Sequence, residues 1–383
     1  MAKVLLVDTN FSSQPIYNAL QEYGHEVHVV GGNPSDCLAR VAKKYWPINY
    51  AEVNLLKQLI ESERYDFIVP GCTDRSYSSC AEVGSGLFPG LENSSIDQEL
   101  NNKANFRALA NKLKISVPLK QEEKWEELRW PLIVKPVDSF SGKGITVLRY
   151  PDREKFLRAT EIAKNASASG YYLIEDFVEG VLHSHSAFLY DGKIVRDFVV
   201  EEQCSVNPFV VDTSRLLQYP NPKILNGLRN SVESIARELD LKNGLFHVQF
   251  IQNKDNFWLI EVTRRCPGDL YSQLIEMSTG YNYVDAYVRS FLNLPPIIEK
   301  YVSTRNYVMR HTITVPTEQS YSYIHYKQSV LIDRWVSLSL VGDKLLPSPL
   351  SRIGILFASA NSETELDNLF QITLNHQLYD VIS

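Results

Sequence analysis

Cysteine, long apolar runs and surplus positive charge are scarce or absent in this chain of 383 residues. Its five cysteines are odd in number and form no CxxC pair, which excludes a disulfide scaffold and indicates reduced thiols in a cytoplasmic protein. No apolar run approaches the ~18 residues of a membrane helix, and Val4–Val7 is too short for a signal peptide, so we expect no membrane partner. Lysine and arginine (39) are outnumbered by aspartate and glutamate (45), so we expect no nucleic-acid partner.

Two common nucleotide-binding signatures are also missing. No GxGxxG motif follows the first predicted strand, which argues against a Rossmann dinucleotide site. The P-loop pattern GxxxxGK[ST] is absent as well. What the chain does have is an ordinary globular composition, 44% hydrophobic and 22% charged, and enough length for two or three domains.

The first part of the chain alternates short β-branched runs with helical patterns. Strands are predicted at Val4–Val7, Val27–Val30 and Phe67–Pro70, with a helix over Val53–Glu63. This alternation predicts a Rossmann-like parallel sheet with crossover helices, whose ligands bind beyond the carboxyl ends of the strands. Three polar residues at the end of the third strand are therefore candidate substrate contacts: Thr73, Asp74 and Arg75. Turn and cap chemistry explains them equally well.

A lysine followed by a Ser/Gly loop is the first informative motif in the second part of the chain. Lys135 ends a buried apolar strand, and the loop leads to the next strand. Small residues let backbone N–H groups approach phosphate oxygens, and lysines add positive charge. The loop positions are Ser139, Ser141, Gly142, Lys143 and Gly144. Taken alone, a flexible hairpin with a capping lysine is the more frequent explanation.

Two further motifs place polar groups at strand ends. Glu175 and Asp176 end an apolar strand, where free backbone groups can pair with an adenine edge, although solvated surface acids are commoner. A hairpin about Asn253–Asn256 places four side chains on one face: Gln249, Glu261, Thr263 and Arg265. Oxygen donors of this kind suit Mg²⁺, and an arginine can neutralise a transferring phosphoryl group. An exposed face with a salt bridge is the alternative.

In order and spacing, these motifs resemble the ATP-grasp superfamily of carboxylate–amine ligases. The resemblance includes Asn102–Arg107, where Lys103 is similar to the family's first ATP lysine. It implies an α/β and α+β fold: an N-terminal Rossmann-like domain (1–97), an ATP-grasp core (98–300) with a lid subdomain (about 117–177), and a strand-rich C-terminal domain (301–383). The core would hold ATP on an antiparallel sheet, and the family is often dimeric.

The resemblance also implies roles for individual residues. Lys103 and Lys135 would hold the phosphates, and the 139–144 loop would close over them, with Lys135 and Arg265 acting in catalysis. The adenine and ribose contacts would come from the Glu175 side chain, the Asp176 carbonyl, the Val178 N–H and His183. Mg²⁺ or Mn²⁺ would lie at Gln249, Glu261 and Thr263, and the substrate near Gly268 and Asp269.

Two departures from the family pattern concern the metal. The family usually has Glu at the position of Gln249 and Asn at the position of Thr263, so the carboxylate count falls by one. The ending Arg264–Asp269 is similar to that of carbamoyl-phosphate-synthetase-like and amino-acid-ligase-like members. The resemblance therefore implies an ATP-dependent ligase that activates a small-molecule carboxylate as an acyl phosphate for attack by an amine. A non-ligating ATP-binding scaffold or sensor, and a kinase that phosphorylates a hydroxyl, are the alternatives.

Overall fold

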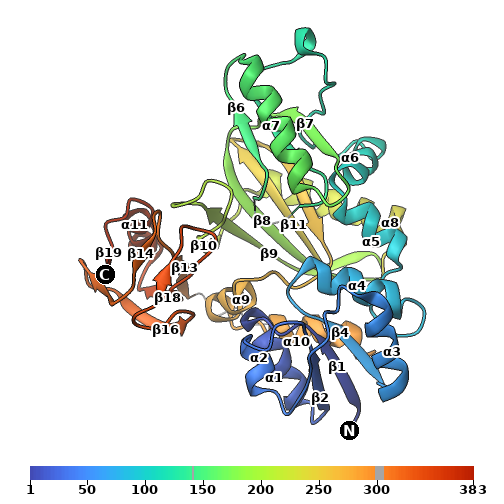
Figure 1. Ribbon diagram of the computed structural model, residues 1–383. Helices are drawn as coiled ribbons and strands as arrows, with labels where there is room; N and C mark the ends of the chain where they lie inside the picture. The colour runs from blue at the N-terminus through green and yellow to red at the C-terminus, as the bar shows by residue number, and fades with distance from the viewer. Residues whose placement is uncertain (140–141, 298–305) are drawn as a thin grey trace.

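A computed structural model describes residues 1–139, 142–297 and 306–383. In Figure 1 the N-terminal domain lies at the bottom in blue, a small sheet with one long helix stands at the top, and the C-terminal strands lie to the left. A long antiparallel sheet runs between them. The expected combination of a parallel N-terminal sheet, a small antiparallel sheet and a large antiparallel sheet is confirmed.

The N-terminal sheet is parallel, with the strand order β3-β2-β1-β4. Its strands are β1 (Lys3–Val7), β2 (Glu26–Val30), β3 (Lys44–Trp46) and β4 (Phe67–Pro70). The intervening and following helices are η1 (Phe11–Ser13), α1 (Gln14–Glu22), α2 (Cys37–Val41), α3 (Val53–Glu63) and α4 (Asp74–Gly84). Val4 to Val7 are fully buried because a central parallel strand is covered on both faces.

The small sheet is antiparallel, with the order β6-β5-β7, and has a core of its own. Its elements are η2 (Trp125–Glu127), β5 (Leu132–Pro136), β6 (Thr146–Leu148), α7 (Arg153–Ala166) and β7 (Tyr172–Asp176). Phe156, Ala159 and Ala163 form the buried stripe of α7 and pack with Leu132 and Val134 of β5. This unit lies within the range (about 117–177) in which the resemblance implied a lid, and that role stays a prediction.

The large sheet has eight antiparallel strands in the order β12-β11-β8-β9-β10-β13-β18-β16. They are β8 (Val181–Tyr190), β9 (Lys193–Gln203), β10 (Thr213–Leu216), β11 (Gly244–Asn253), β12 (Asn256–Thr263), β13 (Tyr307–Ile313), β16 (Leu331–Ser337) and β18 (Gly354–Ala360). Because β13 pairs with β10, the C-terminal strands continue the core sheet across the boundary expected at residue 300.

Helices cover both faces of the large sheet. The remaining elements are α5 (Ser94–Asn101), α6 (Lys103–Lys112), α8 (Pro222–Glu238), α9 (Tyr271–Thr279), α10 (Tyr283–Phe291), α11 (Glu363–Leu374), and two short strand pairs, β14 (Gln319–Ser320) with β17 (Lys344–Leu345) and β15 (Tyr323–Tyr326) with β19 (Tyr379–Ile382). Leu228 and Val232 of α8 pack in one core with Phe246 of β11. A second core joins α10 to the N-terminal sheet, and the Tyr287 hydroxyl donates to the Pro70 carbonyl at 3.1 Å.

Several short or polar elements were not predicted from the sequence. Helix α4 has the sequence DRSYSSCAEVG, in which small polar residues hide the buried stripe of Tyr77, Cys80 and Ala81. Helix α5 spans the domain boundary expected after residue 97. The Asn93 side chain caps this helix by accepting the Ile96 N–H at 3.0 Å. These helices form because capping and tertiary burial outweigh weak local patterning.

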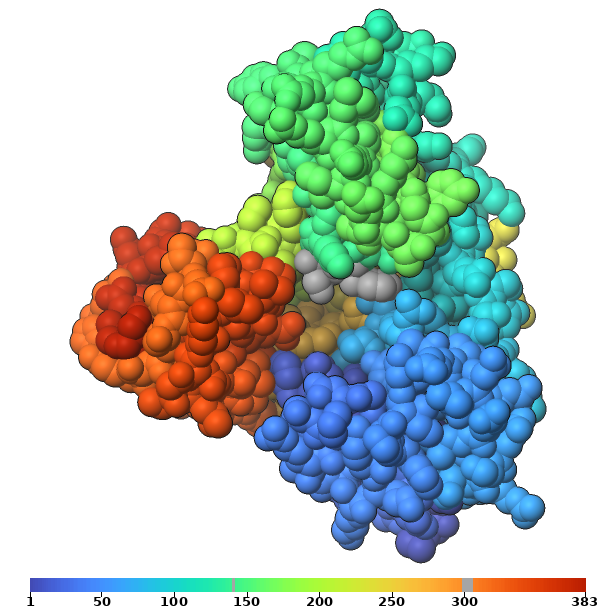
Figure 2. Space-filling view, viewed as in Figure 1, coloured from blue at the N-terminus to red at the C-terminus, as the bar shows by residue number. Residues whose placement is uncertain are grey.

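A hollow lies where the three parts of the molecule face one another. Figure 2 shows it between the small sheet (green), the N-terminal domain (blue) and the C-terminal strands (red), with residues of the core at its floor. All five cysteines are free thiols. Within the residues described, no helix has both the length and the apolar character needed to cross a bilayer.

Candidate functional site

The ammonium group of Lys103 joins three motifs that lie far apart in the sequence. Lys103 is the first residue of α6, and the Asn102 side chain caps that helix by accepting the N–H groups of Ala104 and Asn105. Lys103 Nζ lies 3.1 Å from Glu261 Oε1 on β12 and 3.1 Å from the backbone oxygen of Ser139. The helix, the loop after β5 and the hairpin therefore meet at one point.

Lys135 takes part in a sealed cluster with one acid and a second cation. Its Nζ lies 2.6 Å from Glu175 Oε2 on β7, and Arg107 Nε lies 2.6 Å from Glu175 Oε1. Burial lowers the pKa of Lys135 to about 8, although the Glu175 charge opposes this shift. Burial alone would raise the pKa of Glu175, but the two cations hold it below its usual value. The contact predicted between Glu175 and adenine stays a prediction.

The loop after β5 begins next to Lys103. The Ser139 hydroxyl donates to the Lys143 carbonyl at 3.1 Å, and the Lys143 side chain is exposed. Ser141, the other predicted serine contact, lies outside the described residues. The described part of this loop is therefore anchored at its start by Lys103 and presents a second lysine to solvent.

Gly142 and Gly144 have backbone conformations that require glycine. Their φ angles are +70° and +79°, in the left-handed region. A Cβ at Gly142 would lie 2.5 Å from Phe209 Cβ, and one at Gly144 would lie 2.4 Å from Ala166 Cβ. The loop therefore passes close to both neighbours, and a larger residue at either position would clash.

The end of β7 is held by neighbouring segments of the lid. Asp176 Oδ1 accepts from Gln121 Nε2 at 2.7 Å and from Arg129 Nη2 at 2.9 Å, and the Asp176 N–H donates to the Leu119 carbonyl at 2.9 Å. Val178 follows in the half-buried segment after the strand. The adenine contacts expected of the Asp176 carbonyl and the Val178 N–H stay predictions.

His183 lies apart from the metal candidates. Its ring stacks on Phe250 with the ring centroids 5.3 Å apart, and Nδ1 lies 3.0 Å from the Val181 carbonyl. On β8 the neighbouring Ser184 is the residue paired with Gln249, so His183 points to the opposite face of the sheet. Burial lowers the pKa of His183. The structure thus does not bring His183 together with Gln249 or Glu261.

Gln249 and Glu261 are directly opposite each other on β11 and β12 and so share one face, as the hairpin pattern predicted. Gln249 Nε2 donates to Glu202 Oε2 of β9 at 2.8 Å. The amide oxygen of Gln249 is therefore the atom of this side chain that could bind a metal ion. Burial, aided by the charge of Asp269, raises the pKa of Glu202 to about 7. The sequence analysis did not single out Glu202, because its position beside Gln249 depends on strand pairing rather than on spacing.

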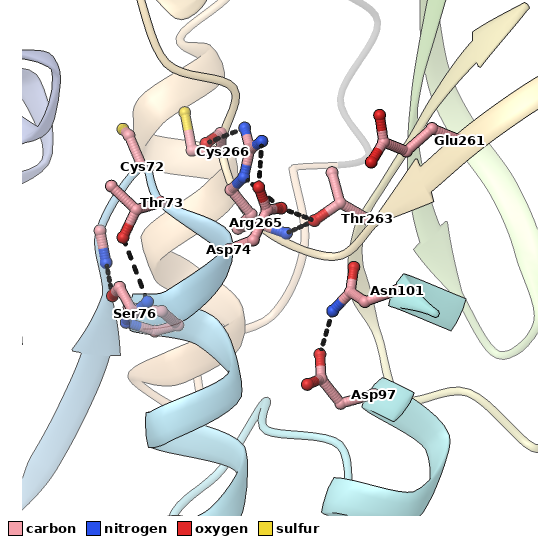
Figure 3. A network of polar contacts seen from close by, with 12 residues as sticks. Cys72, Thr73, Asp74, Ser76, Asp97, Asn101, Glu261, Thr263, Arg265 and Cys266 are labelled. Atoms are coloured by element: carbon pink, nitrogen blue, oxygen red, sulfur yellow. Dashed lines mark hydrogen bonds and ion pairs between the residues drawn. The ribbon is translucent and has the colours of Figure 1, made fainter. Parts of the chain in front are cut away.

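Arg265, which follows β12, is clamped by a residue of the N-terminal domain. Its Nε and Nη2 donate to the two Asp74 oxygens at 2.8 and 3.0 Å (Figure 3). The Thr263 hydroxyl also donates to Asp74 Oδ1 at 3.2 Å, while the Glu261 carboxylate lies away from this network (Figure 3). Burial alone would raise the pKa of Asp74, but the Arg265 charge and hydrogen bonds hold it below its usual value.

The other candidate substrate residues have different surroundings. The Thr73 side chain caps α4 by accepting the Ser76 N–H at 3.1 Å, whereas the Arg75 side chain is exposed. Asp269 Oδ2 lies 2.9 Å from Nη2 of the buried Arg310 of β13. Gly268 lies near the end of β4, where an added Cβ would be 3.7 Å from the Cys72 carbonyl. Thr73 and Gly268 are thus near Asp74, while Arg75 is turned to solvent.

The oxygen atoms at the hairpin suit a hard cation such as Mg²⁺, which takes most of its ligands from phosphate groups and water. It offers one carboxylate, Glu261, and the Gln249 amide oxygen, while the Thr263 hydroxyl is bonded to Asp74. Over residues 1–139, 142–297 and 306–383, no three His, Cys, Asp or Glu side chains form a group able to hold a metal ion. The residues present therefore fit one weakly held Mg²⁺ better than two.

Two buried arginines were also missed by the sequence analysis. Arg107 approaches Glu175 and also donates to the Ile260 carbonyl at 2.9 Å, and Arg310 donates to the Asp269 carbonyl at 2.7 Å. Arg107 stands four residues after Lys103, one helical turn along α6, and that spacing was an available signal. For Arg310 the contacts with Asp269 and Ser214 come from distant segments, which local sequence does not reveal.

Comparison with known proteins supports this arrangement. Residues 100–269 match a family model described as ATP-grasp domain. Phosphoribosylamine–glycine ligase of Pyrococcus furiosus is 26% identical over 356 residues, covering 80% of this chain and 77% of the relative. The large chain of carbamoyl phosphate synthase of Sulfolobus acidocaldarius is 22% identical over 68% of this chain but only 26% of its own length.

The solved structures extend the likeness to the whole chain. L-amino acid ligase from Bacillus licheniformis superposes with a TM-score of 0.81 at 18% identity, over 100% of this chain and 98% of that one. At such low identity the superposition establishes the fold, while the family match and the curated relatives supply the family. Residues 100–269 carry an ATP-grasp domain, and the chain is an ATP-dependent carboxylate–amine ligase of the ATP-grasp type.

Proposed function

We propose that the chain activates a small-molecule carboxylate as an acyl phosphate at the expense of ATP and then joins it to an amine. The observation that carries this proposal is the contact between Lys103 Nζ and Glu261 Oε1 at 3.1 Å. It places the first predicted phosphate lysine beside the only carboxylate of the predicted metal set. A phosphate chain and its cation need this kind of shared position, because phosphoryl transfer depends on positioning and charge neutralisation.

In this proposal the nucleotide lies between the small sheet and the large sheet. Lys103 and Lys135 bind phosphate oxygens, and the loop with Ser139, Gly142 and Gly144 covers them. Glu175 and Asp176 of β7, with Val178 just after that strand, would stand at the adenine end of the site. The short distances within the Lys135–Glu175–Arg107 cluster support a preorganised cation at this end of the site.

Glu261, with the Gln249 oxygen, would hold the magnesium or manganese ion that accompanies ATP in this superfamily. Bound there, the ion would neutralise phosphate charge and orient the terminal phosphoryl group. Arg265 donates N–H groups to the same phosphoryl oxygens as the substrate carboxylate attacks the γ-phosphorus and ADP leaves. The amine then attacks the acyl carbon, and inorganic phosphate leaves with the bonding electron pair.

The shape of the molecule supports a site that excludes water during this chemistry. An acyl phosphate hydrolyses readily, so the intermediate has to be enclosed. The hollow between the three parts of the chain (Figure 2) is where closure of the small sheet would enclose it. Substrate recognition beyond the phosphate would then fall to Thr73, Gly268 and Asp269 at the edge of the N-terminal domain.

A screen of ATP-dependent phosphate release over pairs of amino acids and other small carboxylates and amines tests the proposal. A ligase releases phosphate only when both substrates are present. A kinase transfers the phosphate to a hydroxyl without releasing it, and a scaffold binds ATP without turnover. Absence of ADP formation with every pair, together with ATP binding that Lys135→Ala leaves unchanged, would contradict the proposal.

Variants of the metal position sharpen the test. Glu261→Ala should reduce Mg²⁺-dependent turnover by about 100-fold or more, because it removes the only carboxylate of the set. Glu179→Ala is the matched control, since that acid forms an exposed pair with Arg149 at 3.0 Å. Turnover that survives Glu261→Ala would place the metal elsewhere. A homodimer and a cytoplasmic location stay predictions, the first to be checked by light scattering.

A further inference from the structure

Asp74 uses both carboxylate oxygens within the molecule. It receives Nε and Nη2 of Arg265 at 2.8 and 3.0 Å and the Thr263 hydroxyl at 3.2 Å (Figure 3). The Asp74 and Arg265 side chains are only 15% and 19% exposed. An acid with this many internal partners is poorly suited to bind a substrate itself, which was the role suggested by its place at a strand end.

The geometry of the guanidinium group shows what this clamp leaves open. Arginine has five N–H bonds in one plane. Asp74 takes Nε and one side of Nη2, and the Cys266 carbonyl accepts from Nη1 at 3.3 Å. Of the remaining N–H bonds, the one on Nη2 belongs to the end edge that this nitrogen shares with Nη1. Such an edge can donate two parallel hydrogen bonds to a phosphoryl or carboxylate group.

We infer that Asp74 is a positioning residue, which orients Arg265 so that its end edge faces the transferring phosphoryl group. The inference rests on the proposed function and adds a residue from the N-terminal domain to the phosphate site. Asp74 is the first residue of α4, while Arg265 follows β12 of the core. The phosphate site is therefore complete only when the N-terminal domain is in place against the core.

A purely structural role for Asp74 predicts a different outcome. Acids in the first turn of a helix are commonly stabilising, and an ion pair between two domains holds them together. Both effects would appear in the unfolding temperature. Neither would change how well the site distinguishes a nucleotide that carries the terminal phosphate from one that lacks it.

Calorimetry with ATPγS and with ADP, each with Mg²⁺, tests this distinction in the full chain. The readout is the ratio of the two affinities, measured for wild type, Asp74→Ala, Arg265→Ala and the double variant. We expect Asp74→Ala to lower the ratio about tenfold, because a small misplacement of a clamping group is costly. The same substitution should change nothing in the Arg265→Ala background, where there is no guanidinium to orient.

Two further variants guard against trivial explanations. Asp74→Asn keeps an acceptor for Arg265 Nε and should restore part of the ratio. Glu63→Ala removes another acid of the N-terminal domain, paired with Lys3 at 2.6 Å, and should leave the ratio at the wild-type value. A wild-type chain that binds neither nucleotide would contradict the proposed function. Nucleotide binding with an unchanged ratio in Asp74→Ala, or with equal losses in both backgrounds, would overturn the positioning role.

Discussion

The two ion-pair clusters of the site differ in how they are built. The Lys135–Glu175–Arg107 cluster lies between the lid sheet and α6, and its Glu175 side chain is fully buried. The Arg265–Asp74 pair joins the core to the N-terminal domain, and both side chains remain partly exposed. Removing one member of a sealed cluster leaves a buried charge without its partner, which lowers the stability of the fold strongly. A partly exposed pair between domains can be broken at a smaller cost in stability. The first should therefore contribute more to the stability of the fold than the second.

Glu175→Ala gives the largest effect that this comparison predicts. It leaves Lys135 and Arg107 as two buried cations without their shared acid, so the free energy of unfolding should fall by about 3–5 kcal/mol. Denaturant unfolding followed by circular dichroism measures this change. The control is Glu179→Ala, whose exposed partner Arg149 predicts a loss of about 0.2–1 kcal/mol. Similar losses in the two variants would show that the cluster is not sealed.

Arg265→Ala should show the opposite balance. The substitution removes the group proposed to stabilise the transferring phosphoryl oxygens, so kcat should fall by about 100- to 1,000-fold. The unfolding temperature should fall less than in Glu175→Ala, since the Asp74 left without its partner is 15% exposed whereas Glu175 is fully buried. Steady-state phosphate release and thermal unfolding, measured on the same preparation, check the split. A large loss of stability with unchanged kcat would reverse the roles assigned to the two clusters.

Sequence analysis predicted the parts of the site that depend on local pattern. Strand periodicity placed Gln249 and Glu261 on one face of the hairpin, and they are paired there, with a register shift next to Gln249 that the periodicity did not predict. The helix predicted over Val53–Glu63 is α3, which has those bounds. These features are short-range, and a periodic pattern carries enough information to specify them.

Contacts between distant segments could not be derived in the same way. Asp74 was expected at a strand end, but its bonds with Arg265 span 191 residues. The approach of Glu202 to Gln249 depends on β8 lying between β9 and β11, which spacing along the chain does not reveal. His183 falls on the opposite face from Gln249 because the register across β8 places Ser184 there instead. A one-residue change of register reverses the direction of every side chain in a strand.

The pH dependence of nucleotide binding is the smallest and most specific expected effect. The pKa of Lys135 is lowered to about 8, so the unbound chain loses this proton as the pH rises from 7 to 9. Binding of phosphate requires the charged form, so the affinity for ADP with Mg²⁺ should fall about tenfold over this interval. Lys135→Gln, which cannot titrate, should bind more weakly at pH 7 and lose the dependence attributable to Lys135.

The same loss of a proton weakens nucleotide binding but stabilises the fold. General alkaline damage would instead lower both. Above pH 8 the unfolded chain still protonates this lysine while the folded chain does not. The unfolded state then binds more protons, so this group makes the fold more stable as the pH rises toward its ordinary pKa of about 10.4. Calorimetric titration and denaturant unfolding at pH 7, 8 and 9 should show weaker binding alongside a stabilising contribution that Lys135→Gln lacks. Parallel losses of affinity in wild type and Lys135→Gln would show that Lys135 is not the titrating group, and the sealed cluster would then have no part in binding phosphate.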